Sequence, residues 1–265
     1  MRYFDGTLLE NRVLGPHTFV LRVGGCESLA GALPGQFVML RGEWGSDPLL
    51  SRAFSLLGVR EGGEADILVK GVGKATQLLE RALPGAVLHL LGPLGTSFPE
   101  PDAGRRDWLV AGGVGLAPLL MHAKRAAAAG IADGVTMFYG GRTEADLVLL
   151  DELAAVGCEL VLTTEDGSRG QAGYVTAAVA GALAGASPRP TLLACGPDPM
   201  LRAVARLAHS EQLPAYLSLE GEMACGIGAC LACAVPCKSV PFRYTCKHGP
   251  VLALDDLAGP FGPPS

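Results

Sequence analysis

The sequence predicts an α+β protein of several domains: an antiparallel β-barrel, a parallel α/β domain and a small cysteine-bearing C-terminal domain. Two changes of pattern along the 265 residues indicate this division. Short alternating strands give way to buried strands that end in glycine, and later four cysteines gather near the C-terminus. A chain of this length has room for two domains and a small third one. We expect the barrel at 1–98, the α/β domain at 99–215 and the cysteine domain at 216–265.

The first region consists of short apolar runs that alternate with polar residues and are separated by turn signals. Residues 18–23, 36–40 and 66–70 are examples, and Pro-Gly pairs at 34–35 and 84–85 stand just ahead of such runs. Alternation with a period of two places one side of each strand in a core. This rhythm is typical of an antiparallel barrel or sandwich.

The second region alternates short buried strands with helical stretches. Strands are expected at 108–111, 135–139, 159–163 and 191–195, and an Ala-rich helix is expected at 116–129. Such alternation predicts a parallel sheet covered by helices. Sheets of this kind bind ligands at the carboxyl ends of their strands, where the strand order reverses.

A glycine-rich turn, GGVG at 112–115, connects the first of these strands to its helix. Such a turn can bring backbone N–H groups and a helix N-terminus to a pyrophosphate. The spacing is not the G-x-G-x-x-G fingerprint, and a tight turn without a ligand would have the same sequence. Two later strands also end in glycine motifs, GGR at 140–142 and CGP at 195–197, which favours a ligand site.

The predicted barrel has its own candidate binding residues, RAFS at 52–55 and KGVGKAT at 70–76. Arg52 offers a planar guanidinium group to a phosphate, and Ser55 offers a hydroxyl to a ring heteroatom. The glycine loop, which opens a predicted helix, offers a helix N-terminus to a second anionic group. Taken alone, Arg52 would be an ordinary surface cation and the glycines a bulge.

Four cysteines near the C-terminus, Cys225, Cys230, Cys233 and Cys246, have the spacing C-x4-C-x2-C-x12-C. This order is the ferredoxin pattern for a [2Fe–2S] cluster. The small residues between the first three cysteines allow backbone N–H groups to approach the sulfurs. Zinc is an alternative, because Cys237 could form a short knuckle with Cys233. Free cysteines or a disulfide are a further alternative.

The composition indicates a redox protein of the cytoplasm. The net charge of −5 and the pI near 5.6 argue against nucleic acid as a partner. The first residues lack the cationic and apolar segments of a signal peptide, and no run of about 18 apolar residues predicts a membrane span. Cysteines of this spacing in such a chain indicate metal ligands, not a disulfide framework.

Together these motifs resemble the ferredoxin–NADP reductase superfamily, in which a flavin barrel with an R-x-[FY]-S strand precedes a pyridine-nucleotide domain with a GG-x-G-x-x-P turn. The runs LEGEMACGIGACLACAVPC at 219–237 and YTCKHGPVLALDDL at 244–257 narrow the match. They are similar to the electron-transfer subunits of NAD-dependent (class 1B) dihydroorotate dehydrogenases, and the resemblance extends from about residue 8 to residue 257. Two departures are Ala53, where proline is common, and KAT at 74–76, where a glycine-threonine pair is usual.

The resemblance implies FAD, NAD(H) and a [2Fe–2S] cluster as cofactors, and it assigns residues to each of them. The FAD site would use Arg52, Ala53, Phe54, Ser55, Val69, Lys70, Gly71, Ala75 and Thr76. The nicotinamide site would use Gly112, Gly113, Gly115 and Pro118, with Cys195, Gly196 and Met200 as its far wall. The cluster ligands would be Cys225, Cys230, Cys233 and Cys246. No side chain is expected to act as a catalytic acid or base.

For function, the resemblance implies an NAD-dependent oxidoreductase subunit of pyrimidine biosynthesis. Electrons would pass between NADH and the FMN of a dihydroorotate dehydrogenase catalytic subunit through FAD and the cluster, in a complex of two plus two chains. A subunit of a ferredoxin:NADP transhydrogenase or sulfide dehydrogenase is the alternative function, and a redox-sensing module is another. The apolar pairs at 223–224 and 231–232 suit either a docking face or packing on the chain's own α/β domain.

Overall fold

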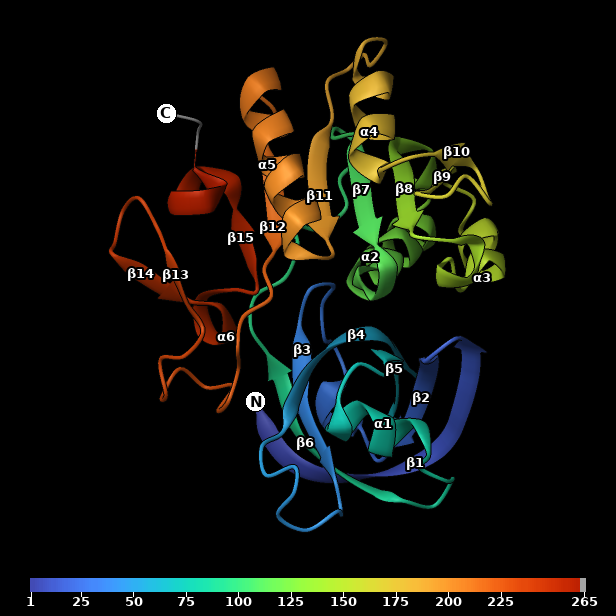
Figure 1. Cartoon of the computed structure of the whole chain (residues 1–265), viewed down its shortest axis with the longest axis vertical. Coiled ribbons are helices and arrows are strands. Elements are labelled where there is room, and N and C mark those ends of the chain that lie inside the picture. The colour runs from blue at the N-terminus through green and yellow to red at the C-terminus, as the bar shows by residue number, and fades with distance from the viewer. Residues whose placement is uncertain (263–265) are drawn as a thin grey trace.

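The computed structural model describes residues 1–262 and contains the three predicted regions (Figure 1). The barrel lies at one end of the molecule and the α/β sheet at the other, while the cysteine-bearing segment runs along one side. Within residues 1–262, no helix has the length and apolar character needed to cross a membrane. The expected combination of a barrel, a parallel α/β domain and a cysteine region is confirmed.

The N-terminal region is a closed barrel whose strands neighbour one another in the order β1-β2-β5-β4-β3-β6. All the paired strands are antiparallel, and alternate side chains fill the interior, as a period of two requires. A short helix, α1, joins β5 to β6 and lies over one end of the barrel. The bounds are β1 (Arg2–Gly15), β2 (Thr18–Gly24), β3 (Phe37–Gly42), β4 (Arg52–Arg60), β5 (Glu64–Lys70), α1 (Lys74–Glu80) and β6 (Val87–Leu94).

The second region is a sheet with the strand order β10-β9-β8-β7-β11-β12-β15. Its pairs are parallel except that β15 runs antiparallel to β12 at one edge. The chain runs outward from β7 to β8 and β9 and then returns to β11 on the other side of β7, so the order reverses between β7 and β11. The bounds are β7 (Asp107–Gly112), β8 (Val135–Gly141), β9 (Glu159–Thr164), β10 (Gln171–Ala172), β11 (Thr191–Cys195), β12 (Ala215–Ser218) and β15 (Val251–Ala253).

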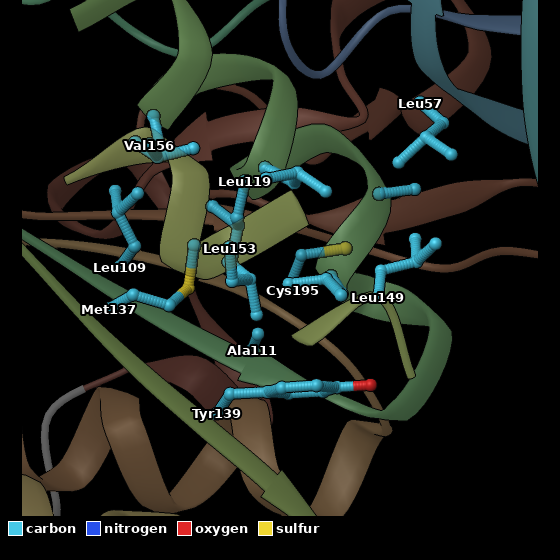
Figure 2. Close-up of a cluster of buried hydrophobic side chains, with 14 of the residues drawn as sticks. Leu57, Leu109, Ala111, Leu119, Met137, Tyr139, Leu149, Leu153, Val156 and Cys195 are labelled. Carbon is cyan, nitrogen blue, oxygen red and sulfur yellow. The ribbon is translucent and has the colours of Figure 1, made fainter. Parts of the chain in front are cut away.

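Helices cover both faces of this sheet. On one face α2 (Leu116–Ala128) and α3 (Leu150–Val156) pack on alternate residues of β7, β8 and β11, and Figure 2 shows part of this cluster. On the other face α4 (Val175–Leu183) and α5 (Asp198–Glu211) pack on the remaining residues of the same strands. The strands are therefore buried on both faces, which explains their nearly continuous apolar sequences.

Helix α2 packs on the barrel as well as on the sheet. Leu116 and Leu120 belong to one buried cluster that also contains Leu57 and Leu68 of the barrel. Figure 2 shows Leu57 beside the labelled residues of the α/β region. Met121 of the same helix belongs to the core of the barrel itself. The barrel and the sheet thus share apolar side chains across their junction.

The C-terminal segment leaves the α/β sheet after β12 and returns to it as β15, where Ser218 lies opposite Val251. Between these strands lie the cysteine loop, a two-stranded hairpin and a short helix that carries Cys246. The predicted division at 215/216 therefore does not coincide with an end of the sheet. The bounds of the additional elements are β13 (Ala234–Pro236), β14 (Phe242–Tyr244) and α6 (Thr245–His248).

A buried polar network fastens the segment that connects the barrel to the sheet. Asp107 is the first residue of β7. It accepts a hydrogen bond from Arg105 (Nε to Oδ1, 2.6 Å), and its other carboxylate oxygen lies 3.0 Å from Nε2 of His122 in α2. Arg105 also donates to the backbone carbonyl of Glu100 (2.7 Å). The Glu100 carboxylate in turn accepts hydrogen bonds from Arg125 of α2 (2.8 Å). The connecting segment is therefore held to α2 at both of its ends.

Burial alone would raise the pKa of Asp107, but the hydrogen bonds and charges of His122 and Arg105 hold it below its ordinary value. We therefore expect Asp107→Asn to lower the free energy of unfolding at pH 7 by about 3 kcal/mol. The substitution removes the charged partner of Arg105 and of the buried His122. Urea unfolding measures this difference.

The same substitution should change the pH dependence of stability. Because the pKa of Asp107 is lower in the folded chain than in the unfolded chain, its contribution is complete above about pH 5 and is lost as the pH falls through the folded value. The wild type should thus lose stability more steeply than Asp107→Asn between about pH 5 and pH 2. Asp133→Asn, in an exposed turn, is the matched control. Parallel pH profiles of the wild type and Asp107→Asn would contradict the prediction.

Candidate functional site

A cavity of about 1100 Å³ lies between the barrel, the α/β sheet and the cysteine segment. This volume suits a ligand of dinucleotide size. All three regions contribute to its wall. The barrel contributes Phe37, Leu49, Leu50, Arg52, Ala53, Phe54, Ser55, Leu68, Lys70, Val72, Gly73, Lys74, Ala75 and Thr76. The sheet region contributes Val114, Gly115, Ala117, Cys195 and Ser218, and the chain beyond β12 contributes Leu219, Glu220, Gly221, Glu222, Met223, Ala224, Ala232 and Pro250.

Most of the residues predicted to bind FAD lie in this wall. They are Arg52, Ala53, Phe54, Ser55, Lys70, Ala75 and Thr76. Val69 and Gly71 lie outside it. The side chain of Val69 is 1% exposed and points into the barrel core, so this residue can offer a ligand only its backbone. The N–H group of Gly71 is bonded to the carbonyl of His17 (2.6 Å).

Arg52 and Lys70 bring positive charge to the cavity. Arg52 donates from one nitrogen to the carbonyl of Leu50 (2.6 Å), which fixes the side chain but occupies only part of its donor fork. Lys70 donates to Asp146 (Nζ to Oδ1, 3.0 Å), on the loop after β8. Burial acts to raise the pKa of Asp146, but the hydrogen bond and charge of Lys70 lower it. This ion pair ties the barrel to the α/β region at the cavity.

Thr76 shapes the glycine loop beside the cavity. Its hydroxyl donates to the carbonyl of Gly73 (2.9 Å) and accepts from the N–H groups of Val72 and Gly73 (3.0 Å each). These bonds supply one half of a capping box at the start of α1: the Thr76 side chain bonds the backbone of Gly73, which as the N-cap residue has no side chain to return the bond. The hydroxyl is thus engaged by the loop itself, so Thr76 sets the shape of the loop that faces a ligand.

The predicted nucleotide turn lies directly against the end of β11. A Cβ atom on Gly115 would be 2.2 Å from the carbonyl oxygen of Cys195, and one on Gly112 would be 2.7 Å from Met200 Sδ. The strand order reverses at this point, where open α/β sheets bind ligands. Gly115 and Cys195 line the cavity. The other predicted residues lie outside its wall: Gly112, Gly113, Pro118, Gly196 and Met200.

Cys195 is a neutral wall residue at neutral pH. Burial raises the pKa of its thiol to about 12, with a smaller opposing effect from Ser218 and a further increase from Glu220. A thiol in this state is neither a nucleophile nor a metal ligand. The expectation that Cys195 forms one wall of a binding site fits this environment.

Glu220 and Ser218 are cavity residues that the sequence reading did not identify. Although Glu220 reaches solvent, the surrounding protein raises its pKa, mainly by desolvation and also through Asp198. Both residues lie at or just after the carboxyl end of β12. The rule that ligands bind at the carboxyl ends of parallel strands could have identified them, had this strand been assigned to the sheet.

The four predicted cluster cysteines lie in one loop and the helix facing it. Cys233 and Cys246 are each 2% exposed, whereas Cys230 is exposed. The N–H group of Gly228 donates to Cys246 Sγ (3.1 Å), and that of Cys230 donates to Cys225 Sγ (3.4 Å). Hydrogen bonds of this kind from backbone to cysteine sulfur are typical of iron–sulfur sites.

Cys225 lies beside Cys230, and Cys246 lies beside Cys233 and also experiences the charge of Cys225. Burial acts to raise the pKa of Cys225, but surrounding N–H groups lower it to about 6; burial and Cys233 raise that of Cys246 to about 12. Within residues 1–262, no three His, Cys, Asp or Glu side chains are close enough to form a mononuclear metal site. Four neighbouring thiols that do not converge on a single metal position suit the thiolate ligands of a cluster with two irons. A zinc site needs all four at one centre.

Cys237, the possible zinc-knuckle residue, lies in a different environment. Its side chain is buried in the apolar cluster that includes Leu254 and Leu257, and its thiol points to the carbonyl of Val235 (3.8 Å). Cys233 belongs to a separate cluster with Cys246. The two halves of the proposed knuckle are thus not brought together.

Comparison with known families gives three matches along the chain. Residues 9–98 match the oxidoreductase FAD-binding domain, and residues 109–206 match the oxidoreductase NAD-binding domain. Residues 220–258, which include all four cluster cysteines, match the iron–sulfur cluster binding domain of dihydroorotate dehydrogenase B. The three predicted cofactors, FAD, NAD(H) and a [2Fe–2S] cluster, are confirmed at the level of these domains.

Individual relatives agree with these matches. The chain is 38% identical, over 95% of its length and 96% of theirs, to the electron transfer subunits of dihydroorotate dehydrogenase B (NAD(+)) from Bacillus caldolyticus and Geobacillus kaustophilus. It is also similar to the solved structure of an NADH-dependent reduced ferredoxin–NADP oxidoreductase. The TM-score is 0.81 at 27% identity, and the match covers 94% of this chain and 87% of that one. A ferredoxin reductase of carbazole 1,9a-dioxygenase matches with a TM-score of 0.72 at 26% identity, over 82% of this chain and 68% of that one.

A flavin barrel, a nucleotide-binding sheet and a four-cysteine segment around one cavity define an NAD(H)-linked flavoprotein oxidoreductase with an iron–sulfur domain. The relatives make the assignment more specific. The chain belongs to the family of electron transfer subunits of dihydroorotate dehydrogenase B.

Substitution of the cysteines tests the cluster site. Cys233→Ser and Cys246→Ser should each lose most of the bound iron and sulfide, because each thiolate is one of the four predicted ligands. Cys237→Ser should keep about two irons and two sulfides per chain. Iron and sulfide analysis of anaerobically purified protein measures the difference. Zinc in place of iron in the wild type, or loss of iron in Cys237→Ser, would contradict the assignment.

Proposed function

We propose that this protein is the electron-transfer subunit of a dihydroorotate dehydrogenase of pyrimidine biosynthesis. It would pass electrons between NAD(H) and the FMN of a catalytic partner subunit. The observation that carries this proposal is the shared cavity, whose wall joins Ser55 of the barrel and Gly115 of the nucleotide turn to Ala224 and Ala232. These two alanines are the direct neighbours of Cys225 and Cys233. The arrangement suits three redox groups placed in line.

In this proposal the barrel residues hold FAD. Arg52 provides N–H donors for the pyrophosphate, and Ser55 provides a hydroxyl for the flavin ring. Lys70, fixed by Asp146, contributes a positive charge near the cofactor. Ala75 and the loop shaped by Thr76 allow a phosphate to approach the backbone. When bound, FAD exchanges a hydride with NAD(H) and single electrons with the cluster.

The nucleotide would bind at the end of the sheet, against the turn at residues 112–115. Gly115 and Cys195 form the part of this surface that faces the barrel. On the β12 side the cavity is bounded by residues 218–224. Because no side chain must transfer a proton in a hydride exchange, we assign no catalytic acid or base.

A partner surface is expected around the exposed edge of the cysteine loop. Ile227 is 46% exposed and Leu231 is 50% exposed, on either side of the exposed Cys230. Apolar side chains in an exposed loop are typical of protein interfaces. We infer that the FMN-bearing catalytic subunit binds here, in a heterotetramer of two plus two chains. Eight cysteines without a disulfide among them suit the reducing cytoplasm.

A second candidate function follows from the similarity to the NADH-dependent reduced ferredoxin–NADP oxidoreductase. That similarity covers 94% of this chain. In that case the partner would be a large flavoprotein of a ferredoxin:NADP transhydrogenase, and not an orotate-binding subunit. The identity of the co-purifying chain distinguishes the two functions.

The proposed function is tested by purifying the tagged chain anaerobically from its own cells with its partner. We expect the complex to oxidise NADH when orotate is added, and to contain FAD, FMN and a [2Fe–2S] cluster. Arg52→Leu should lower the FAD content at least about tenfold, because a charged phosphate contact is worth roughly 1.5–3 kcal/mol. Cofactor analysis and NADH consumption measure these results. A complex that consumes NADH but ignores orotate would move the assignment to the second candidate.

The partner surface has its own test. Ile227→Asp and Leu231→Asp should each weaken association with the catalytic subunit by about tenfold or more, because a charge would be buried in an apolar interface. Pull-down of the catalytic subunit measures this, while NADH-dependent reduction of ferricyanide by the isolated subunit should be unchanged. Val13→Asp, an exposed apolar residue on the barrel, is the matched control. Full association of both loop variants would refute this surface.

A further inference from the structure

The cysteine loop rests on an apolar patch of the barrel formed by Phe37, Met39 and Leu94, which we call the cluster seat. These three side chains form one buried group with Cys233 and Cys246. The two buried cysteines therefore pack on the barrel, while Cys230 lies exposed on the other side of the loop. The barrel thus provides the floor of the predicted cluster site.

Met39 makes the closest approach of the seat to the loop. Its side chain is 2% exposed. A Cβ atom on Gly226 would lie 2.5 Å from Met39 Cγ and 3.1 Å from its Sδ. Gly226 also has a φ of +72°, a left-handed conformation that favours glycine. The loop therefore lies directly on Met39, with no space for a side chain between them.

The seat also reaches the wall of the cofactor cavity. Phe37 lines the cavity and belongs to the seat at the same time. It pairs with Ser55 across β3 and β4, and Met39 pairs with Ala53. A shift of the loop on the seat would therefore change both its distance from the cavity and its contact with water.

We propose that Met39 is a positioning residue for the iron–sulfur cluster. It packs against Gly226 and so fixes the distance between the ligand loop and the flavin cavity. It also keeps water away from the sulfurs of Cys233 and Cys246. The inference rests on the proposed function in one respect, that the four cysteines bind a [2Fe–2S] cluster.

The potential of an iron–sulfur cluster depends on solvent access and on hydrogen bonds to its sulfurs. Water near the sulfurs stabilises the more negative, reduced state. A polar side chain at position 39 should therefore make the cluster easier to reduce, while an apolar residue of similar volume should leave the potential unchanged. A purely structural role for Met39 would alter stability but not this difference.

The first experiment is a redox titration of the holoprotein, followed by the electron paramagnetic resonance signal of the reduced cluster. We expect Met39→Gln to favour reduction roughly tenfold, a shift of about 59 mV to more positive potential. Met39→Leu should titrate like the wild type. Met121→Gln, the same change at a buried methionine of the barrel core, controls for general destabilisation. A Met39→Gln potential equal to that of Met121→Gln would overturn the proposal.

The second experiment tests the contact with Gly226 through a compensating pair, with iron content and the cluster spectrum as readouts. Gly226→Ala should lose most of its iron, because the new methyl group meets Met39 in a strained backbone. Adding Met39→Ala should restore a substantial part of that iron. Gly228→Ala is the control: its φ is +80°, but its nearest side chain is the flexible Lys247. Adding Met39→Ala to Gly228→Ala should not increase the iron content.

Failure of the compensating pair, or an equal gain in Gly228→Ala, would refute the contact. These outcomes differ from failure of the proposed function. If the wild type binds no [2Fe–2S] cluster, the function is wrong. If the wild type carries the cluster and only the Met39 variants behave like the controls, this inference alone is wrong.

Discussion

Burial of apolar side chains on both sides of α2 is the interaction on which the cofactor cavity depends. Leu116 and Leu120 join the helix to the sheet and to Leu57 and Leu68 of the barrel. Because this contact is apolar and close-packed, it fixes the barrel relative to the sheet instead of allowing them to hinge freely. Ser55 and Gly115, on opposite sides of this contact, therefore line the same cavity.

The sequence allowed the local parts of the site to be predicted, because each part depends on residues that are neighbours in the chain. The functional groups of each motif lie within a short stretch of sequence. This holds for the cysteine spacing, the glycine turn at 112–115 and the strand at 52–55. Long-range contacts were not predictable in this way. The bond between Lys70 and Asp146, the burial of Val69 in the barrel core and the place of Glu220 in the cavity depend on how distant segments meet.

The first strand, β1 (Arg2–Gly15), was missed for a related reason. Its sequence mixes charged and apolar residues without regular alternation, and its pairing with β2 has register shifts at two points. A pattern of period two cannot be followed across such irregularities. The strands β12 and β15 were not expected, because they are too short to be distinguished from loop sequence, although they are paired in the sheet.

The return of the chain to the sheet at β15 closes the cysteine segment into a loop of the sheet. Residues 219–250 form an excursion whose two ends are held together by the pairing of Ser218 with Val251. The entropy of closing that loop is thus offset by sheet hydrogen bonds and by apolar burial. The sheet therefore holds both ends of the segment that carries the four predicted cluster ligands.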